Sequence, residues 1–141
     1  MSNFSFKDFN QTIIDEFRAN GGEVSAPVAK PLILLSTVGA KSGEARLNPV
    51  SYFMEGPRMV IIASKGGMPS NPDWYYNLLA NPEVTVETGS GERYRASATP
   101  ITDMAERDRL YAKMVEINPG FAEYERNTTR KIPVVYLDRI S

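Results

Sequence analysis

Apolar side chains near the start of the chain recur every three or four residues. In FSFKDFNQTIIDEFR, residues 4–18, this spacing is typical of one face of a helix. The apolar positions are Phe6, Phe9, Ile13 and Phe17. Gly21 and Gly22 are expected to end the helix. We predict that it docks on the core of the fold. A lid, or a helix on a membrane surface, is the alternative, although Lys7 and Arg18 are its only basic residues.

Further along, the apolar positions form short runs rich in β-branched and aromatic residues, which are typical of strands. The predicted strands cover residues 32–35, 50–54, 59–63, 84–87, 94–98 and 134–137. Turn-forming residues in EGPR (55–58) and TGSGE (88–92) predict hairpins between neighbouring strands.

Two helices are predicted between the strands. The first lies in NPDWYYNLLANP, with Asn71 as its N-cap and Pro72 at its first helical position. The second runs from about Asp103 to Glu116, and the alternating charges of DMAERDRLYAKMVE predict a solvated face. A further helical turn is expected in GFAEYERNT, directly after Pro119.

Short strands joined by hairpins, with helices between and beside them, favour a mainly β (α+β) fold. A small barrel of antiparallel strands is favoured over a doubly wound sheet, because strict βαβ alternation is missing. The 141 residues suffice for one domain with one core. We therefore expect a single domain over residues 1–141, with the N-terminal helix and linker in 1–22 and the barrel core in 32–138.

The chain contains no cysteine and no histidine. Disulfides, thiol nucleophiles, Cys/His zinc sites and Ser-His-Asp triads all need one of these residues, so the sequence excludes them. An enzyme made from this chain is therefore expected to take its chemistry from an organic cofactor.

The charges of the chain nearly cancel, with 16 basic and 17 acidic residues. This balance predicts no nucleic-acid partner, because no general basic field attracts a polyanion. The sequence has neither an apolar run long enough to span a bilayer nor the features of a signal peptide. We expect a cytoplasmic protein whose membrane binding is at most peripheral.

The segment STVGAKSGEARLNPV carries the first candidate site. Ala40 precedes the lysine where a nucleotide-binding P-loop needs glycine, so that motif is excluded. Gly39 and Gly43 are expected to let backbone amides turn outward beside Lys41, Ser42 and Arg46. Such a nest suits a phosphate or carboxylate. The alternative is a solvated hairpin loop whose charges bind nothing.

A second loop follows the same plan. In IIASKGGMPSNPDWYYNLLANP, a strand leads into Ser64 and Lys65, two glycines, and a capped helix whose first turn presents Trp74 and Tyr75. Helix N-termini attract anions, and aromatic faces bind flat rings. The two loops together predict a site for an anionic ligand with a planar ring. Trp74 as an ordinary core residue remains the alternative.

Three segments that contain these loops resemble the deazaflavin-dependent nitroreductase family: STVGAKSGEARLNPV, IIASKGGMPSNPDWYYNLLANPEVTVE and GFAEYERNTTRKIPVVYL. The resemblance covers about Leu32 to Leu137. It implies a split β-barrel of antiparallel strands with flanking helices, and the use of coenzyme F-420 (8-hydroxy-5-deazaflavin).

The resemblance also implies which residues bind the coenzyme. Lys41, Ser42 and Arg46 would hold its phosphate and glutamyl tail. The residues beside its ring would be Asn48, Pro49, Val50 and Ser51 on one side and Ala63, Ser64 and Lys65 on the other. The residues that close the site from the helix would be Trp74, Tyr75 and Asn77.

The same resemblance implies the reaction, which is hydride transfer from the reduced coenzyme to an electron-poor acceptor such as a quinone, enone or nitro compound. Tyr124 matches a tyrosine that faces the substrate, and Tyr124 and Ser64 would be the catalytic hydrogen-bond donors. Phe121 stands where relatives often carry another tyrosine. A non-catalytic lipid or fatty-acid carrier, or a flavin mononucleotide-binding reductase, would use the same barrel. Exposed edge strands would also allow a homodimer.

Overall fold

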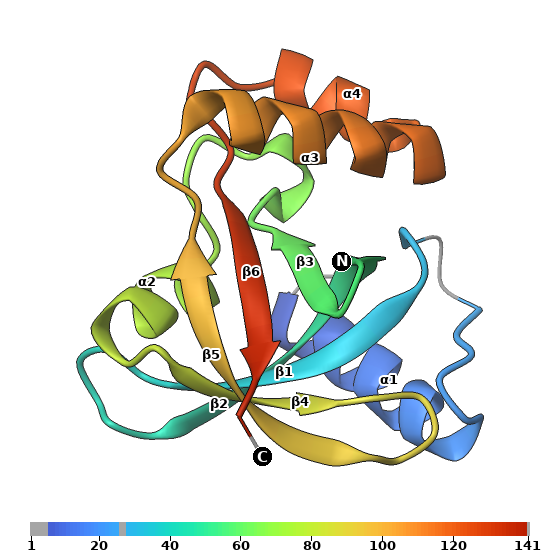
Figure 1. Ribbon diagram of the computed structural model, residues 1–141. Coiled ribbons are helices and arrows are strands. Elements are labelled where there is room, and N and C mark those ends of the chain that lie inside the picture. Colours follow the sequence, from blue (N-terminus) through green and yellow to red (C-terminus); the bar gives the residue numbers. More distant parts are fainter. Residues whose placement is uncertain (1–5, 26–27, 141) are drawn as a thin grey trace, which may run out of the picture.

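The computed structural model describes residues 6–25 and 28–140. Six antiparallel strands form a closed barrel in the order β1-β2-β3-β6-β5-β4 (Figure 1). The strands are β1 (Leu32–Val38), β2 (Ala45–Glu55), β3 (Arg58–Ile62), β4 (Glu83–Glu87), β5 (Arg93–Pro100) and β6 (Val134–Arg139). The helices are α1 (Phe6–Ala19), η1 (Lys65–Gly67), α2 (Asp73–Ala80), α3 (Met104–Ile117) and α4 (Gly120–Arg126). The mainly β barrel with flanking helices that the sequence predicts is confirmed.

All six predicted strands are present, but β2 begins at Ala45 rather than at residue 50. Its early residues pair with β1, Arg46 opposite Thr37 and Pro49 opposite Leu34. The glycine-rich stretch after β1 is therefore the tip of a long hairpin.

Strand β2 changes its pairing partner along its length. It pairs with β1 from Ala45 to Ser51, and with β3 only from Tyr52 to Glu55. Among the described residues, the first half therefore presents an open edge on the side away from β1. Pro49 lies in this edge. Proline has no backbone N–H to donate, and no hydrogen bonds to a second neighbouring strand are lost at this position.

The interior of the barrel is filled by alternate residues of the strands. In β1, Ile33 and Leu35 point into the core that Trp74 and Leu78 of α2 help to close. Because both faces of β1 are covered, the run LILL is apolar throughout.

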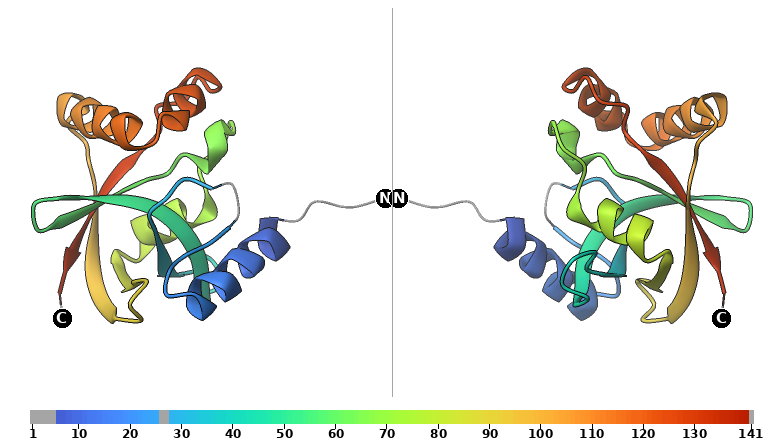
Figure 2. Two further views of the ribbon diagram at one scale, coloured as in Figure 1. Left: turned by 90° about the vertical axis from the view of Figure 1, so that its right-hand side faces the viewer. Right: turned by 90° about the vertical axis from the view of Figure 1, so that its left-hand side faces the viewer.

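Helices cover the outside of the barrel. The α1 side chains Ile13, Ile14 and Phe17 are buried against the outward-facing Leu32 and Leu34 of β1, so the predicted docking of the N-terminal helix is confirmed. The start predicted at residues 4 and 5 lies outside the described residues. On another side, α3 and α4 pack on β3 and β6. Figure 2 shows α1 and the α3–α4 pair well apart, with the strands between them.

Two local predictions are wrong. The N-cap of α2 is Pro72, not Asn71, because the Asn71 side chain accepts a hydrogen bond from Arg130 at 2.7 Å and donates one to the Tyr76 hydroxyl at 3.2 Å. The charges of α3 are not all solvated, since Arg107 is only 1% exposed. Asp103 does cap α3, by accepting from the backbone N–H of Ala105 at 3.0 Å.

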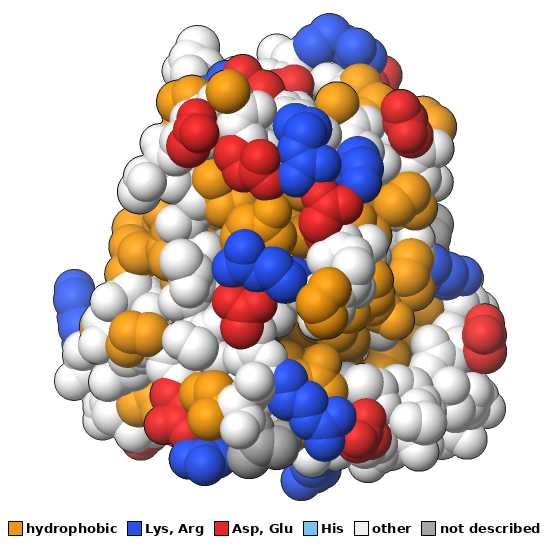
Figure 3. Space-filling view, in the orientation of Figure 1, with side chains coloured by type: hydrophobic (Ala, Val, Ile, Leu, Met, Phe, Trp, Pro, Cys, Tyr) orange, Lys and Arg blue, Asp and Glu red, His pale blue; other side chains and the backbone are white. Residues whose placement is uncertain are grey.

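The other charged residues of α3 tie that helix to the barrel. Glu55 of β2 pairs with Arg109 at 2.6 Å and with Lys113. Glu106 accepts from Arg109 at 2.6 Å and from the Tyr136 hydroxyl at 2.7 Å. Figure 3 shows basic and acidic side chains side by side on this face. The Arg109 guanidinium and then the Tyr136 hydroxyl lower the pKa of Glu106 from its ordinary value of 4.5 to about 2.

This lowered pKa predicts an acid-sensitive contribution to stability. The contribution of Glu106 is fully present above about pH 4.5 and is lost as the pH falls towards 2, because the unfolded chain takes up the proton first. We expect Glu106→Gln to have a melting temperature that depends less on pH in this range than that of the wild type. Thermal melts followed by circular dichroism would measure this, with Glu116→Gln on the same helix as the control. Equal slopes for wild type and Glu106→Gln would contradict it.

Candidate functional site

A cavity of about 620 Å³ opens beside the free edge of β2. Its walls come from α1, the first half of β2, the loop between β3 and α2, the start of α2, and α4. The predicted site residues that line it are Asn48, Pro49, Val50, Ser51, Ser64, Lys65, Trp74 and Tyr124. The apolar part of its wall includes Phe9, Ile13, Val28, Leu32, Ile62 and Phe121.

Three predicted site residues, Ala63, Tyr75 and Asn77, do not line the cavity. Ala63 is fully buried, and its N–H donates to the carbonyl of Pro133 at 3.0 Å. Tyr75 packs against the barrel core, where burial raises the pKa of its hydroxyl. Asn77 is buried, and its side-chain amide is held by two protein partners. Trp74 lines the cavity and is at the same time a core residue, since it is only 6% exposed.

Lys41 and Ser42 lie in the β1–β2 turn and Arg46 lies at the start of β2, and none of the three lines the cavity. The amides of the two glycines are themselves paired within the turn. The Gly39 N–H donates to the carbonyl of Glu44 at 2.7 Å, and the Gly43 N–H donates to the carbonyl of Gly39 at 3.0 Å. Within the described residues, the amides of the turn without an acceptor are those of Lys41 and Ser42.

The charges of this turn are exposed. Arg46 donates to Glu44 at 3.2 Å, and both side chains are more than half exposed, so this pair holds the guanidinium only weakly. Lys41 is exposed and has no ion-pair partner among the residues that the structure describes. The turn therefore keeps two cations available for an anionic group.

Asn77 of α2 fixes the turn to the barrel. Its Oδ1 accepts from the backbone N–H of Ala40 at 3.0 Å, and its Nδ2 donates to the Thr37 hydroxyl at 3.1 Å. The side chain of Thr37 is buried as well. The side-chain amide of Asn77 thus holds both the end of β1, at Thr37, and the start of the turn that carries Lys41, at Ala40.

The second glycine-rich loop has an unusual backbone. Lys65, Gly66 and Gly67 have φ angles of 47°, 62° and 80°. Such a conformation costs a residue other than glycine about 1–3 kcal/mol. A Cβ on Gly67 would lie 2.9 Å from both the Cα and the carbonyl oxygen of Tyr124. Gly67 therefore allows α4 to approach the loop closely, and this approach brings Tyr124 to the cavity.

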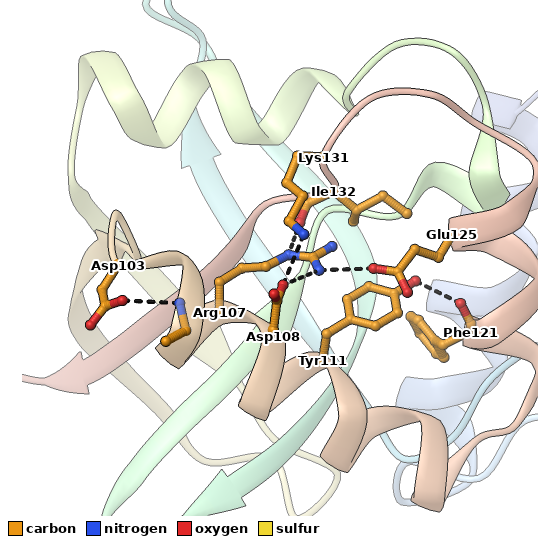
Figure 4. Close-up of polar contacts among 9 residues, drawn as sticks. Asp103, Arg107, Asp108, Tyr111, Phe121, Glu125, Lys131 and Ile132 are labelled. Carbon is orange, nitrogen blue, oxygen red and sulfur yellow. Dashed lines mark hydrogen bonds and ion pairs between the residues drawn. The ribbon is translucent and has the colours of Figure 1, made fainter.

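Helix α4 is held from its other side by α3 (Figure 4). Buried Arg107 donates to Glu125 at 2.8 Å, and the Tyr111 hydroxyl donates to the carbonyl of Phe121 at 2.7 Å. Burial is the main cause that raises the pKa of Tyr111 to about 12. The Phe121 ring meets the Tyr124 ring edge to face, with centroids 5.0 Å apart.

Three residues that hold the site in place, Arg107, Tyr111 and Arg130, were not predicted from the sequence. Arg107 and Tyr111 lie on the buried face of α3 with Leu110 and Met114, and this helical spacing could have identified them. Arg130 binds the loop between β3 and α2, and its position in NTTRKIPV gives no such signal.

Two hydroxyl groups at the cavity, those of Tyr124 and Ser64, are available to a ligand as far as the described residues go. Over residues 6–25 and 28–140, neither the Tyr124 hydroxyl nor the Ser64 hydroxyl forms a hydrogen bond to another residue. A polar group at a cavity wall that is not paired within the protein can donate to a ligand. The arrangement thus combines an apolar wall, two free donors and nearby cations, which suits a flat, anionic organic ligand.

The role of Asn77 leads to a stability prediction. Asn77→Ala removes the partners of the buried Thr37 hydroxyl and of the Ala40 amide, so we expect it to lower the free energy of unfolding by about 1–3 kcal/mol. Asn81→Ala is the matched control, because Asn81 is exposed and makes only a 3.4 Å contact to the carbonyl of Val38. Urea denaturation would measure both variants. Equal losses in the two would contradict the role of Asn77.

Known structures share this fold. A solved structure described as a domain-swapped dimer is 33% identical, with a TM-score of 0.70 over 95% of this chain and 100% of that one. An F420-H2 dependent reductase is 35% identical, with a TM-score of 0.68 over 82% of this chain and 100% of that one. The haem storage protein HutZ from Vibrio cholerae, at 15% identity and a TM-score of 0.60, shares the fold alone.

Sequence relatives agree with the structural ones. An F420H(2)-dependent quinone reductase of Mycobacterium tuberculosis is 37% identical over 130 residues, which cover 87% of this chain and 85% of the relative. A family model described as F420H(2)-dependent quinone reductase matches residues 10–139. The resemblance to deazaflavin-dependent reductases is thereby confirmed, and the chain belongs to the family of F420H(2)-dependent quinone reductases.

Proposed function

We propose that this protein transfers a hydride from reduced coenzyme F-420 to a quinone. The observation that carries the proposal is the cavity. It gathers Asn48–Ser51 of β2, Ser64 and Lys65 of the loop, and Tyr124 of α4, which are far apart in the sequence. These segments carry the motifs that resemble deazaflavin-dependent enzymes, and the family match over residues 10–139 supports the same activity.

The residues present fit coenzyme F-420. A volume of about 620 Å³ is in the range of cofactor sites, and the wall formed by Val50, Ile62 and Trp74 suits a planar ring. Trp74 is nearly buried, so only a small part of its surface is open to a ligand. Lys41 and Arg46, with the unpaired amides of the β1–β2 turn, would hold the anionic tail.

The chain's own residues supply orientation and polarity. When bound, the reduced coenzyme supplies the hydride. The hydroxyl groups of Tyr124 and Ser64 would donate hydrogen bonds to the quinone oxygen, on which negative charge develops. Phe9, Ile13 and Phe121 exclude water from the acceptor side, which strengthens those hydrogen bonds.

The alternative ligands have less support. Flavin mononucleotide also carries a phosphate, and a fatty acid also carries one anionic group, so charge alone does not exclude either. Three cations, Lys41, Arg46 and Lys65, favour a ligand with several anionic groups over a single carboxylate. Membership of the F420H(2)-dependent family favours the deazaflavin over both.

Enones and nitro compounds, as other electron-poor acceptors, belong to the proposal beside quinones. The solved relative described as a domain-swapped dimer supports a homodimer for this chain as well. None of the helices that the structure describes is long and apolar enough to cross a membrane. The cytoplasmic location stays a prediction from the sequence.

The first functional prediction concerns the turn. Lys41→Ala is expected to raise the dissociation constant of oxidised coenzyme F-420 about tenfold, because it removes one charge-assisted contact at an exposed site. The wild-type affinity should also fall as salt is added, and the variant's affinity should fall less steeply. Fluorescence titration of the ring would measure both. Lys131→Ala is the control, because Lys131 pairs with Asp108 on α3. An unchanged affinity and salt dependence for Lys41→Ala would exclude an anion clamp at the turn.

The second functional prediction concerns Tyr124. Tyr124→Phe keeps the ring that packs on Phe121 and removes only the hydroxyl. We expect kcat for quinone reduction to fall about 10²–10³-fold while coenzyme affinity stays the same, as for other lost donors that act in the transition state. Stopped-flow absorbance of the reduced coenzyme would measure this. Full turnover by Tyr124→Phe would show that the hydroxyl has no catalytic role.

A further inference from the structure

Arg130, four residues after the end of α4, binds a single loop. Its Nε donates to the carbonyl of Met68 at 2.9 Å, and its Nη2 donates to the carbonyl of Ser64 at 2.7 Å. Its Nη1 donates to the Asn71 side-chain oxygen at 2.7 Å and to the carbonyl of Ala63 at 3.3 Å. All four acceptors lie between β3 and α2.

The acceptors of Arg130 are all uncharged. Within the part of the chain that the structure describes, no carboxylate pairs with this half-buried guanidinium, whereas the buried Arg107 pairs with two. Burial lowers the pKa of Arg130, but an arginine still keeps its proton at neutral pH. Arg130 therefore brings an uncompensated positive charge to the back of the loop.

The loop that Arg130 holds is also a wall of the cavity. Ser64, Lys65, Gly66 and Met68 line the cavity, and two of them, Ser64 and Met68, give their carbonyl oxygens to Arg130. The three consecutive positive φ angles at Lys65, Gly66 and Gly67 do not persist in a free loop. A planar guanidinium with donors in fixed directions can hold several carbonyl groups at once, which an ammonium group cannot do in the same geometry.

The same loop contacts the acceptor side of the cavity. Gly67 lies against the backbone of Tyr124, so a displacement of the loop would displace α4 or open the contact between them. Arg130 thus holds the loop at the place where it contacts α4. Ser64 and Lys65 of this loop are proposed to bind the coenzyme, and Tyr124 of α4 is proposed to contact the acceptor.

We propose that Arg130 is a positioning residue, whose guanidinium holds the Ser64–Met68 loop in its coenzyme-binding conformation. This inference rests on the proposed function. It requires the forked geometry of arginine and not only a positive charge. Arg130→Lys should therefore behave like a loss of the side chain rather than like a conservative substitution.

The experiment compares Arg130→Lys and Arg130→Ala with Arg126→Lys and Arg126→Ala. Arg126 is the matched control, because it is exposed and its nearest carboxylate, Glu123, is 3.8 Å away. Two quantities are measured for each purified full-length chain. The first is the dissociation constant of oxidised coenzyme F-420, with and without millimolar guanidinium chloride. The second is backbone hydrogen exchange of the protein without the coenzyme.

We expect both Arg130 variants to raise the dissociation constant at least about tenfold. We expect faster exchange confined to residues 64–71 and α4, and restoration of binding in Arg130→Ala by added guanidinium. Wild-type affinity in Arg130→Lys would overturn the proposal, and so would faster exchange spread over the whole barrel, which would mean a general loss of stability. A wild type that binds no coenzyme would overturn the proposed function instead. In that case, unchanged exchange at residues 64–71 in the variants would also overturn the role of Arg130 in the loop.

Discussion

The open edge along the first half of β2 is the constraint on which the site depends. Among the described residues, this strand pairs with β1 alone from Ala45 to Ser51, since its pairing with β3 begins only at Tyr52. Although the order of strands closes the barrel, one edge of β2 is thus left open here, and the cavity lies beside it. Pro49 keeps this edge free, because a residue without an N–H cannot complete a second ladder.

An opening in a barrel becomes a defined site only when the segments around it are held in place. Three segments that carry predicted site residues are each fixed by a polar side chain from outside the segment. Asn77 holds the β1–β2 turn, Arg130 holds the loop after β3, and Arg107 holds α4. Asn77 and Arg130 bind backbone groups of their segments, and Arg107 binds a carboxylate of α4. None of these contacts uses the side chains that line the cavity, which stay available to a ligand. The site is therefore preorganised by residues that do not line it.

The sequence predicted the parts of the fold that depend on local periodicity. The six strands and α1 follow from the spacing of apolar residues, and the family resemblance followed from the motifs in the loops. The early start of β2 was not predictable, because Arg46, Asn48 and Pro49 lack the composition of a strand, and pairing with β1 overrides this local preference.

The remaining errors share one physical cause. The Asn71 side chain can cap a helix or accept from Arg130, and only the folded chain brings that partner, distant in sequence, into contact. The helical spacing of Arg107 could have shown that it is buried, but not what it binds, since its partner Glu125 belongs to another helix. Long-range polar contacts leave no periodic pattern in the sequence, whereas apolar burial does.

The most direct measurement is the oxidation of reduced coenzyme F-420 by a quinone, followed by absorbance without oxygen, with and without the purified protein. We expect the protein to accelerate this reaction catalytically, and to give no acceleration when reduced flavin mononucleotide replaces the deazaflavin. The absence of any acceleration with a series of quinones, together with no binding of the coenzyme, would contradict the assignment of this cavity as a deazaflavin site.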